Sequence, residues 1–318
     1  MHAALLCAVL PARHRSGKFK IITLIKVALM LDYAALAALS EIIRRGSFEA
    51  AAAALGVTPS AVSQRIKGLE ERLGQVLIHR GPPASGTETG LRLMQHLDQV
   101  RLLETTLAAS LRPTGGPAVL RLAVNADSLA TWFPPVMTAL PVLYDLVVDD
   151  QDHARDWLRQ GQVSAAISSD PDPVPGCDAL PLGAMRYLAL ATPDFLARHF
   201  PDGVTEAGLR AAPAITFNAK DALQSRWAQK ATGRRLHLPG HLIPASEPFA
   251  RAVELGLGWG MIPESIAAPA LHQGRLQPLV PDLPLDVALH WHVQRAMAPA
   301  LAPLTAAIRK RAAAELRP

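Results

Sequence analysis

Small polar side chains share one face of a short segment, TPSAVSQRIKGLEERLG, at residues 58–74. Apolar residues recur there at spacings of four, three and four, which predicts an amphipathic helix with a buried stripe of Val62, Ile66, Leu69 and Leu73. The opposite face carries hydroxyl, amide and ammonium groups, on Ser60, Ser63, Gln64 and Lys67. Hydroxyl and amide groups can hydrogen-bond to base edges in the major groove of DNA, and lysine can contact phosphate. A solvated polar face on an ordinary helical bundle is the alternative interpretation.

A second set of polar residues follows apolar runs in the C-terminal two thirds of the chain. They lie in the segments NADS (125–128), DDQD (149–152), SSD (168–170), FNAKD (217–221) and PASE (244–247). In open α/β sheets, ligands bind beyond the carboxyl ends of strands and near helix N-termini. Because a helix N-terminus already favours anions, the recurring aspartates favour a ligand that carries its own positive charges. Each Asp can also be an ordinary N-cap or turn residue.

The helix that carries the first set belongs to a predicted helix-turn-helix. Cap residues and glycines divide this region into helices that begin after Asp32, Ser47 and Thr58 and end at Gly46, Gly56 and Gly74. Pro59 suits the first helical position. The predicted contacts between these helices involve Phe48, Ala52, Leu55, Val62 and Ile66. This arrangement would place the polar face of the last helix where it can enter a DNA groove.

A wing and a long helix are predicted next. The segment VLIHRGPPASGTETG, residues 76–90, is typical of a β-wing, although its prolines and Gly86 make it looser than an ordinary hairpin. An amphipathic linker helix capped by Thr87 should follow, with an apolar stripe of Leu91, Met94, Leu97, Leu102 and Leu103. Pairing with the same helix of a second copy would bury this stripe, and RPTGGP at 112–117 predicts a hinge.

Strands and helices alternate after the hinge. The predicted strands are VLRLAVN, YDLVVDD, AAISSD and RYLALATP, and the predicted helices between them are LATWFPPVMTAL and ARDWLRQG. A second unit of the same kind runs from about residue 193 to 263, and LDVALHWHVQ with a C-terminal helix returns to the first unit. The pattern predicts an α/β sheet with crossovers.

Composition predicts a soluble globular protein, since half of the 318 residues are apolar and 19% are charged. The net charge of +5 comes from residues 1–29, which hold five basic residues and no acid, so that 27 basic residues face 27 acidic ones in the rest. We expect this extension to be an upstream start or a disordered tail, with a functional basic arm as the alternative. It fits neither a signal peptide nor a membrane span. Cys7 and Cys177 offer no disulfide framework, which fits a reducing, cytoplasmic setting.

Enzymatic interpretations find little support. The sequence contains no GxSxG, P-loop, HExxH or CxxC motif. GLGWGMIPE is better explained as a tight helix-to-strand turn than as a phosphate loop, and His290 and His292 lack an evident third metal ligand. Three classes stay open: a ligand-responsive DNA-binding regulator, a protein that only binds amino acids, and an unrecognised α/β enzyme.

The segment SFEAAAAALGVTPSAVSQRIKGLEERLG, with VLIHRG and TETG after it, resembles the winged helix-turn-helix of LysR-type transcriptional regulators. Further segments are similar to the subfamily that controls lysine and arginine export, LysG and ArgP: NADSLATWF, VVDDQDH, AAISSD, MRYLALATPDF, FNAKDALQ and ELGLGWGMIPE. The resemblance covers about residues 30–318. It implies an α/β multidomain protein with a winged helix-turn-helix, a linker helix and two Rossmann-like subdomains of periplasmic-binding-protein type.

The resemblance also implies partners and boundaries. We expect a cytoplasmic homodimer, with a tetramer left open, that binds a pseudo-palindromic promoter site in double-stranded DNA and needs neither cofactor nor membrane. The expected boundaries are 1–29 for the extension, 30–88 for the winged helix-turn-helix, 89–112 for the linker and 118–318 for the effector-binding domain. Within that domain, subdomain I is about 118–191 with 264–318, and subdomain II is about 192–263.

The candidate contacts form two groups. DNA contacts are expected from Ser47, Thr58, Ser60, Ser63, Gln64, Arg65, Lys67 and Arg80, the last one in the minor groove. Effector contacts are expected from Asn125, Asp127, Ser128, Trp132, Asp150, Ser168, Asp221 and Ser246. The hypothesis is a basic amino acid whose carboxylate meets Ser128 or Ser246, whose amino groups meet Asp127, Asp150 or Asp221, and whose stem packs on Trp132. Lys220 is an alternative partner for Asp221.

Overall fold

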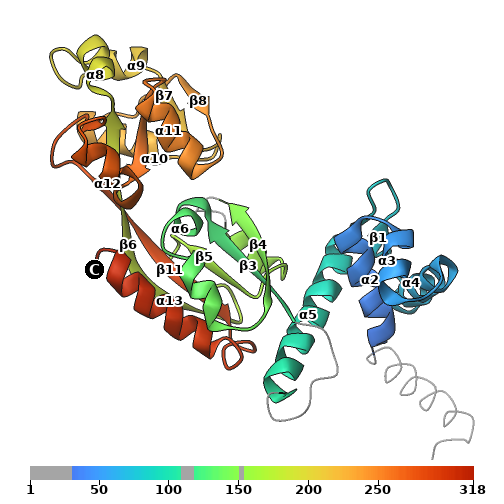
Figure 1. Ribbon diagram of the computed structural model, residues 1–318. Helices are drawn as coiled ribbons and strands as arrows, with labels where there is room; N and C mark the ends of the chain where they lie inside the picture. Colours follow the sequence, from blue (N-terminus) through green and yellow to red (C-terminus); the bar gives the residue numbers. More distant parts are fainter. Residues whose placement is uncertain (1–30, 109–117, 150–153) are drawn as a thin grey trace, which may run out of the picture. The chain divides into compact units, whose positions relative to one another are not determined.

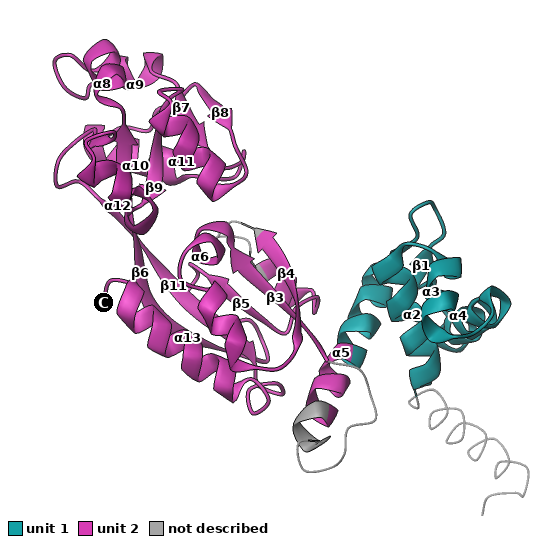
Figure 2. Cartoon of the chain, in the orientation of Figure 1, with its two compact units in different colours: residues 1–97 teal, residues 98–318 magenta. Residues whose placement is uncertain are grey.

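A computed structural model describes residues 31–108, 118–149 and 154–318 (Figure 1). The chain divides into two compact units, residues 1–97 and 98–318, which are treated separately (Figure 2). The predicted extension, the hinge at 112–117 and Asp150 lie outside the described residues. The unit boundary falls within the predicted linker helix.

The N-terminal unit is a helix-turn-helix with a wing, as predicted. Its elements are α2 (Tyr33–Arg45), α3 (Phe48–Leu55), α4 (Pro59–Leu73), β1 (Ile78–His79), β2 (Ser85–Gly86) and the start of α5 (Glu88–Ala108). Asp32, Ser47 and Thr58 each accept backbone N–H bonds at the start of their helices. Glycines in the left-handed region end these helices, at Gly46, Gly56 and Gly74. The predicted caps and stops are confirmed.

The core of this unit is built by the apolar faces of α2, α3 and α4. Val62, Ile66 and Leu69 of α4 are buried, and Phe48 and Leu55 pack against the same cluster. The polar face of α4 is therefore fixed on the outside of the unit, because its apolar stripe is committed to the inside.

Helix α5 is covered by its own chain more than expected. Thr87 caps it by accepting the N–H of Gly90 at 3.1 Å. Leu97 packs in the N-terminal core, and Leu102 belongs to the large core of the C-terminal unit. Leu103 is 43% exposed. Leu97 is thus buried within the N-terminal unit and Leu102 within the C-terminal unit, without a second copy of the chain.

The C-terminal unit is organised by a nine-stranded sheet with the order β4-β3-β5-β11-β6-β9-β7-β8, in which β10 pairs with β6. Its strands are β3 (Val119–Asn125), β4 (Leu143–Asp149), β5 (Ala165–Ser168), β6 (Cys177–Ala191), β7 (Ala214–Thr216), β8 (Gly240–Leu242), β9 (Trp259–Pro263), β10 (Gln277–Pro278) and β11 (Leu285–Gln294). Strands β3, β4 and β5 are parallel to one another, as are β7, β8 and β9. Strand β11 is antiparallel to both β5 and β6.

Two lobes share this sheet, and the long antiparallel pair β6 and β11 connects them (Figure 1). The first lobe holds β3, β4 and β5 with α6 (Ala126–Ala130), the 3-10 helix η1 (Pro134–Ala139), α7 (Ala154–Arg159) and α13 (Ala302–Glu315). The second lobe holds β7, β8 and β9 with α8 (Pro193–His199), α9 (Glu206–Ala211), α10 (Leu223–Thr232), α11 (Ser246–Glu254) and α12 (Glu264–His272). The predicted α/β multidomain architecture is confirmed.

Two details differ from expectation. The segment LATWFPPVMTAL was predicted as one helix, but α6 ends at Ala130 and a separate 3-10 helix starts at Pro134. Pro134 and Pro135 contribute to this break, because they lack the amide hydrogens that would bond to Ala130 and Thr131 in a continued helix. The boundary of subdomain II was also expected near residue 263, but Ala267 and Ala270 of α12 pack with Phe249 of α11 in the second lobe. The chain returns to the first lobe through β11, the predicted segment LDVALHWHVQ.

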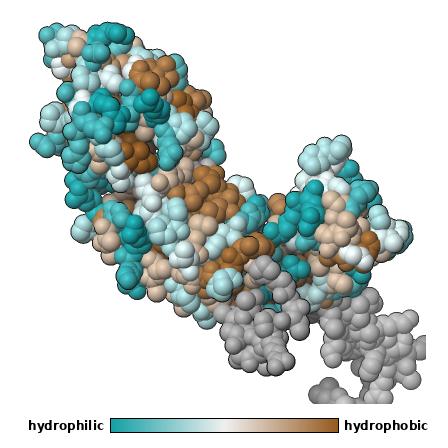
Figure 3. Space-filling model, in the orientation of Figure 1, coloured by the Kyte–Doolittle hydropathy of each residue, from teal (hydrophilic) through white to brown (hydrophobic). Residues whose placement is uncertain are grey.

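Apolar surface remains at the edges of the sheet. Leu143 and Val148 on edge strand β4 are exposed, as is Leu242 on edge strand β8. The space-filling view shows separate hydrophobic patches on one face of the C-terminal unit, between hydrophilic regions (Figure 3). Exposed apolar residues on edge strands are typical of surfaces that contact another protein chain.

Gly90 offers a test of the packing between α5 and the wing. A Cβ atom at this position would clash with the backbone carbonyl of Leu77, whereas a Cβ at Gly68 of α4 meets nothing within 4 Å. We expect Gly90→Ala to lower the free energy of unfolding by about 1–3 kcal/mol through overpacking. The matched Gly68→Ala should raise it by up to about 1 kcal/mol, through helix propensity. Urea unfolding of the full chain measures both, and equal effects would contradict the packing.

Candidate functional sites

The exposed face of α4 carries the predicted DNA-contacting residues. Ser60, Gln64 and Lys67 are exposed, and Ser63 is half-buried. Thr58 Oγ1 lies 3.0 Å from Ser60 Oγ and also accepts the N–H of Ala61. Among the described residues, no hydrogen bond is made by the side chains of Ser63 and Gln64, so their donors and acceptors are available to a ligand.

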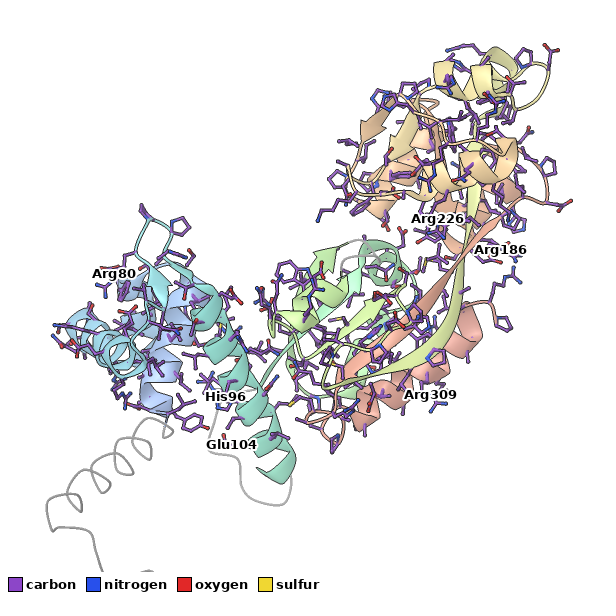
Figure 4. All side chains as sticks on the ribbon, turned by 180° about the vertical axis from the view of Figure 1, so that it is seen from behind. Arg80, His96, Glu104, Arg186, Arg226 and Arg309 are labelled. Atoms are coloured by element: carbon purple, nitrogen blue, oxygen red, sulfur yellow. The ribbon has the colours of Figure 1, made fainter. Side chains whose placement is uncertain are left out.

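Basic residues flank this face. Lys67 Nζ lies 3.8 Å from Glu71 Oε1, and both side chains of this pair are exposed, so the pair is weak. Arg80 follows strand β1, and its guanidinium lies 5.5 Å from the ring centre of Phe48 and 3.6 Å from Glu70 (Figure 4). These contacts hold Arg80 on α3 and α4. Ser47 is the N-cap of α3, and its hydroxyl donates to Glu49.

A small pocket, partly open to solvent, lies between the lobes of the C-terminal unit. The first lobe contributes Ala126 and Asp127. The second lobe contributes an apolar wall and two polar residues, namely Phe217, Leu223, Phe249, Met261 and Pro263 with Asp221 and Ser246. The structure therefore brings together Asp127, Asp221 and Ser246 from the predicted effector contacts, although they are far apart in sequence.

Asp127 joins three elements around this pocket. Its Oδ1 accepts a hydrogen bond from the Ser246 hydroxyl of α11 at 2.6 Å, and its Oδ2 accepts one from the Tyr187 hydroxyl of β6 at 2.7 Å. Burial raises the pKa of Asp127 above its ordinary value of 3.8, the two hydrogen bonds oppose this rise, and the charge of Asp221 adds to it. Within the described part of the chain, no cation forms an ion pair with Asp127.

The Asp221 carboxylate accepts hydrogen bonds from backbone N–H groups of its own loop. It accepts the N–H groups of Phe217 at 3.0 Å and Leu223 at 2.9 Å. These bonds are those of a turn residue, which was the alternative role. The described Lys220 and Asp221 form no ion pair, and the Lys220 N–H donates to Asn218. Asp221 thus shapes the loop while it contributes negative charge to the pocket.

The other predicted effector residues that the structure describes do not line this pocket. Ser128 is fully buried and accepts the indole N–H of Trp132 at 3.1 Å, and that indole packs edge-on against Phe133. Ser168 is buried and accepts the N–H of Asp170. Asn125 is buried, and its side-chain amide makes no hydrogen bond to a residue that the structure describes. Trp132 lines a different pocket, together with Arg186, Glu264 and Arg317.

Sequence reasoning missed Tyr187 and most of the apolar wall. Tyr187 lies in the middle of a strand, and its partner Asp127 is 60 positions away in sequence, so no local spacing signals the contact. Met261 and Pro263 belong to the GLGWGMIPE segment, which was interpreted only as a turn. A turn that leads into a strand at the pocket is the signal that was available.

Two negative observations complete the site description. Among the residues that the structure describes, no group of three or more His, Cys, Asp or Glu side chains could hold a metal ion. The His290 and His292 rings lie 6.3 Å apart, and His292 Nε2 lies 2.9 Å from the carbonyl oxygen of Asp170. Within the described ranges, every helix is too short or too polar to cross a bilayer.

Comparison with known families accounts for both units. Residues 33–91 match the family of bacterial regulatory helix-turn-helix proteins of the lysR family, and residues 114–313 match the LysR substrate binding domain. The chain belongs to the LysR-type transcriptional regulators. Helix α4 lies within the part of the chain that matches the helix-turn-helix family. The residues that line the pocket between the lobes lie within the part that matches the LysR substrate binding domain.

Individual relatives refine this assignment. The regulator LysG of Mycobacterium tuberculosis is 44% identical over 285 residues, which cover 88% of this chain and 93% of the relative. The lysine export transcriptional regulatory protein LysG of Corynebacterium glutamicum is 39% identical over 288 residues, or 88% and 97% of the two chains. Its full-length structure with bound effector Arg matches with a TM-score of 0.64 and 38% identity, over 91% and 100% of the chains. ArgP from Mycobacterium tuberculosis matches with a TM-score of 0.76 and 42% identity, over 91% and 99%.

Asp127 predicts a pH dependence of stability in this LysR-type regulator. A carboxyl whose pKa is higher in the folded than in the unfolded state binds more protons when folded, so its contribution to stability falls as pH rises through the folded pKa. Asp127→Asn removes this contribution and keeps an acceptor for Tyr187. We expect the melting temperature of the variant, relative to wild type, to rise as the pH increases above about 4. The measurement is thermal denaturation without ligand. If the difference in melting temperature between variant and wild type stays constant or falls with pH, the raised pKa of the buried Asp127 carboxyl is contradicted.

Proposed function

We propose that this LysR-type regulator responds to a basic amino acid, lysine or arginine, bound in the pocket between the lobes of its C-terminal unit. The observation that carries the proposal is Asp127, a buried carboxylate for which the described chain supplies hydroxyl donors but no cation. A buried carboxylate is stabilised by an opposite charge. The ligand would supply that charge.

The rest of the pocket suits the same class of ligand. Asp221 adds a second negative charge, and Phe217, Leu223 and Met261 offer an apolar wall for an aliphatic stem. The Ser246 hydroxyl lies at the first residue of α11, where backbone N–H groups favour an anion such as the ligand carboxylate. Bound arginine in the relative from Corynebacterium glutamicum supports this choice, and the name of that relative supports control of an amino-acid exporter gene.

DNA recognition is assigned to the face of α4. Ser60, Ser63 and Gln64 would contact base edges, and Lys67 and Arg65 would contact phosphate. A homodimer would place two such helices on a pseudo-palindromic site. The exposed Leu103 of α5 and the exposed Leu143 and Val148 of β4 support contact with a second copy. The regulator would act in the cytoplasm and without catalysis.

The sheet suggests how the effector could act. A ligand shifts a conformational equilibrium only through different affinities for the two states. The pocket draws residues from both lobes, and the lobes are joined by β6 and β11. A ligand that contacts both lobes would favour the conformation in which they approach, and in a dimer this change would alter the spacing of the DNA-reading helices.

The DNA assignment predicts different defects for base and phosphate contacts. We expect Ser63→Ala and Gln64→Ala each to weaken binding to the specific site by about 1–3 kcal/mol, with little effect on random DNA. Lys67→Ala should weaken both and lower the salt slope by about one. The DNA upstream of the regulator's own gene and of a divergent neighbour is the probe in salt-dependent gel shifts. Lys310→Ala on α13 is the matched lysine control, and wild-type binding by the α4 variants would refute the assignment.

The effector assignment predicts selectivity for basic amino acids. We expect calorimetry to detect lysine or arginine but neither leucine nor glutamate, because the pocket is acidic and apolar. Asp127→Asn should weaken binding at least about tenfold, or about 1.4 kcal/mol, since it removes the charge partner. Asp202→Asn on an exposed turn of the same unit is the matched control. Equal binding of neutral amino acids, or unchanged affinity in Asp127→Asn, would overturn the proposal.

A further inference from the structure

Tyr187 contacts the site without lining the pocket. It lies on β6, where it is in register with Pro263 of β9 and Leu285 of β11, and its side chain is only 1% exposed. The neighbouring strands therefore fix its backbone, and the core around the side chain restrains its ring. The hydroxyl at the end of the ring donates to Asp127 Oδ2 at 2.7 Å.

We propose that Tyr187 is the positioning residue of the effector site: its hydroxyl holds the Asp127 carboxylate charged and oriented toward the ammonium group of a basic amino acid. This inference rests on the proposed function and adds to it a residue that the ligand itself does not touch. Ser246 differs in this respect, because it lines the pocket and donates to the other oxygen, Oδ1.

Hydrogen-bond chemistry supports this division of roles. An ionised carboxylate has about four acceptor sites, of which Tyr187 and Ser246 occupy one on each oxygen. The remaining sites are available to an ammonium group. A rotation of the carboxylate would break the bond to Tyr187, whose ring is held in the buried core of the unit. Tyr187 thus fixes the direction in which the negative charge is presented.

The surroundings of Asp127 make this donor important. Burial and the neighbouring charge of Asp221 both favour the neutral carboxyl, whereas the bonds from Ser246 and Tyr187 favour the charged form. Tyr187 of β6, Ser246 of α11 and Asp221 of the loop before α10 are the groups that act on this carboxyl. Removal of the Tyr187 donor would raise the pKa of Asp127 further, so the ammonium partner would be lost at a higher pH.

Tyr144 provides a matched control. It lies on β4, its hydroxyl is buried, and this hydroxyl makes no hydrogen bond to any described residue. Burial raises its pKa to about 12. Tyr144→Phe therefore removes the same oxygen atom as Tyr187→Phe, from the same unit, but breaks no bond to a carboxylate.

Calorimetry of the full-length regulator with arginine and with lysine tests the inference. We expect Tyr187→Phe to weaken binding about tenfold near neutral pH, as for loss of a hydrogen bond to a charged group. Its affinity should also fall more steeply than that of wild type as the pH is lowered, and Tyr144→Phe should match wild type in both respects. In an Asp127→Asn background, Tyr187→Phe should cause little further loss, because the role acts through Asp127.

The outcomes separate this inference from the proposed function. Wild-type protein that binds neither amino acid overturns the proposed function and this role with it. If wild-type protein binds and Tyr187→Phe keeps the wild-type affinity and pH profile, the positioning role alone is overturned. The same conclusion follows if Tyr187→Phe lowers the affinity equally in the wild-type and the Asp127→Asn backgrounds.

A second measurement tests the inference if the Tyr187→Phe variant does not fold. The chain has three tyrosines, so in a Tyr33→Phe, Tyr144→Phe background, fluorotyrosine incorporation modifies Tyr187 alone. Its more acidic hydroxyl is a stronger donor at nearly the same size. Binding should then tolerate a lower pH than in the unfluorinated background protein, and an unchanged pH profile would overturn the role.

Discussion

A buried carboxylate between two lobes is the constraint on which the effector site depends. Asp127 lies in α6 of the first lobe, two residues after the end of β3. Its two hydrogen-bond donors come from β6 and from α11 of the second lobe. Such a group is costly to bury without partners. The position of the lobes in this conformation is therefore coupled to the state of one side chain, and any ligand that changes the partners of Asp127 also changes what holds the lobes together.

The continuous sheet determines how this coupling can spread. Strands β6 and β11 pair along most of their length and serve both lobes, so the lobes are connected by backbone hydrogen bonds rather than by a loose linker. Tyr187 lies on one of these strands and contacts Asp127 directly. Events at the carboxylate consequently reach the strand that joins the lobes without an intermediate residue.

The sequence predicted best those features that depend on neighbours along the chain. Helix caps such as Asp32 and Thr58, and stops such as Gly46 and Gly74, follow from local hydrogen bonding and backbone freedom, and they are confirmed. The site was predicted only in part. Asp127, Asp221 and Ser246 follow predicted strands or begin predicted helices, which marks them, whereas Tyr187 is an inward-facing strand residue like many others. The pairing of β6 with β11 and β9 decides which inward-facing strand residue contacts Asp127. The periodicity of the sequence does not predict such long-range pairing.

The two faces of α4 separate folding from reading. Val62, Ile66 and Leu69 are committed to the core, while Ser63 and Gln64 make no side-chain hydrogen bond with the described chain. Substitutions on the outer face therefore leave the packing of the bundle intact. Descendants of such a protein could therefore come to recognise new operator sequences through substitutions at a few surface positions of α4. The helical core and the effector-binding unit would be inherited unchanged.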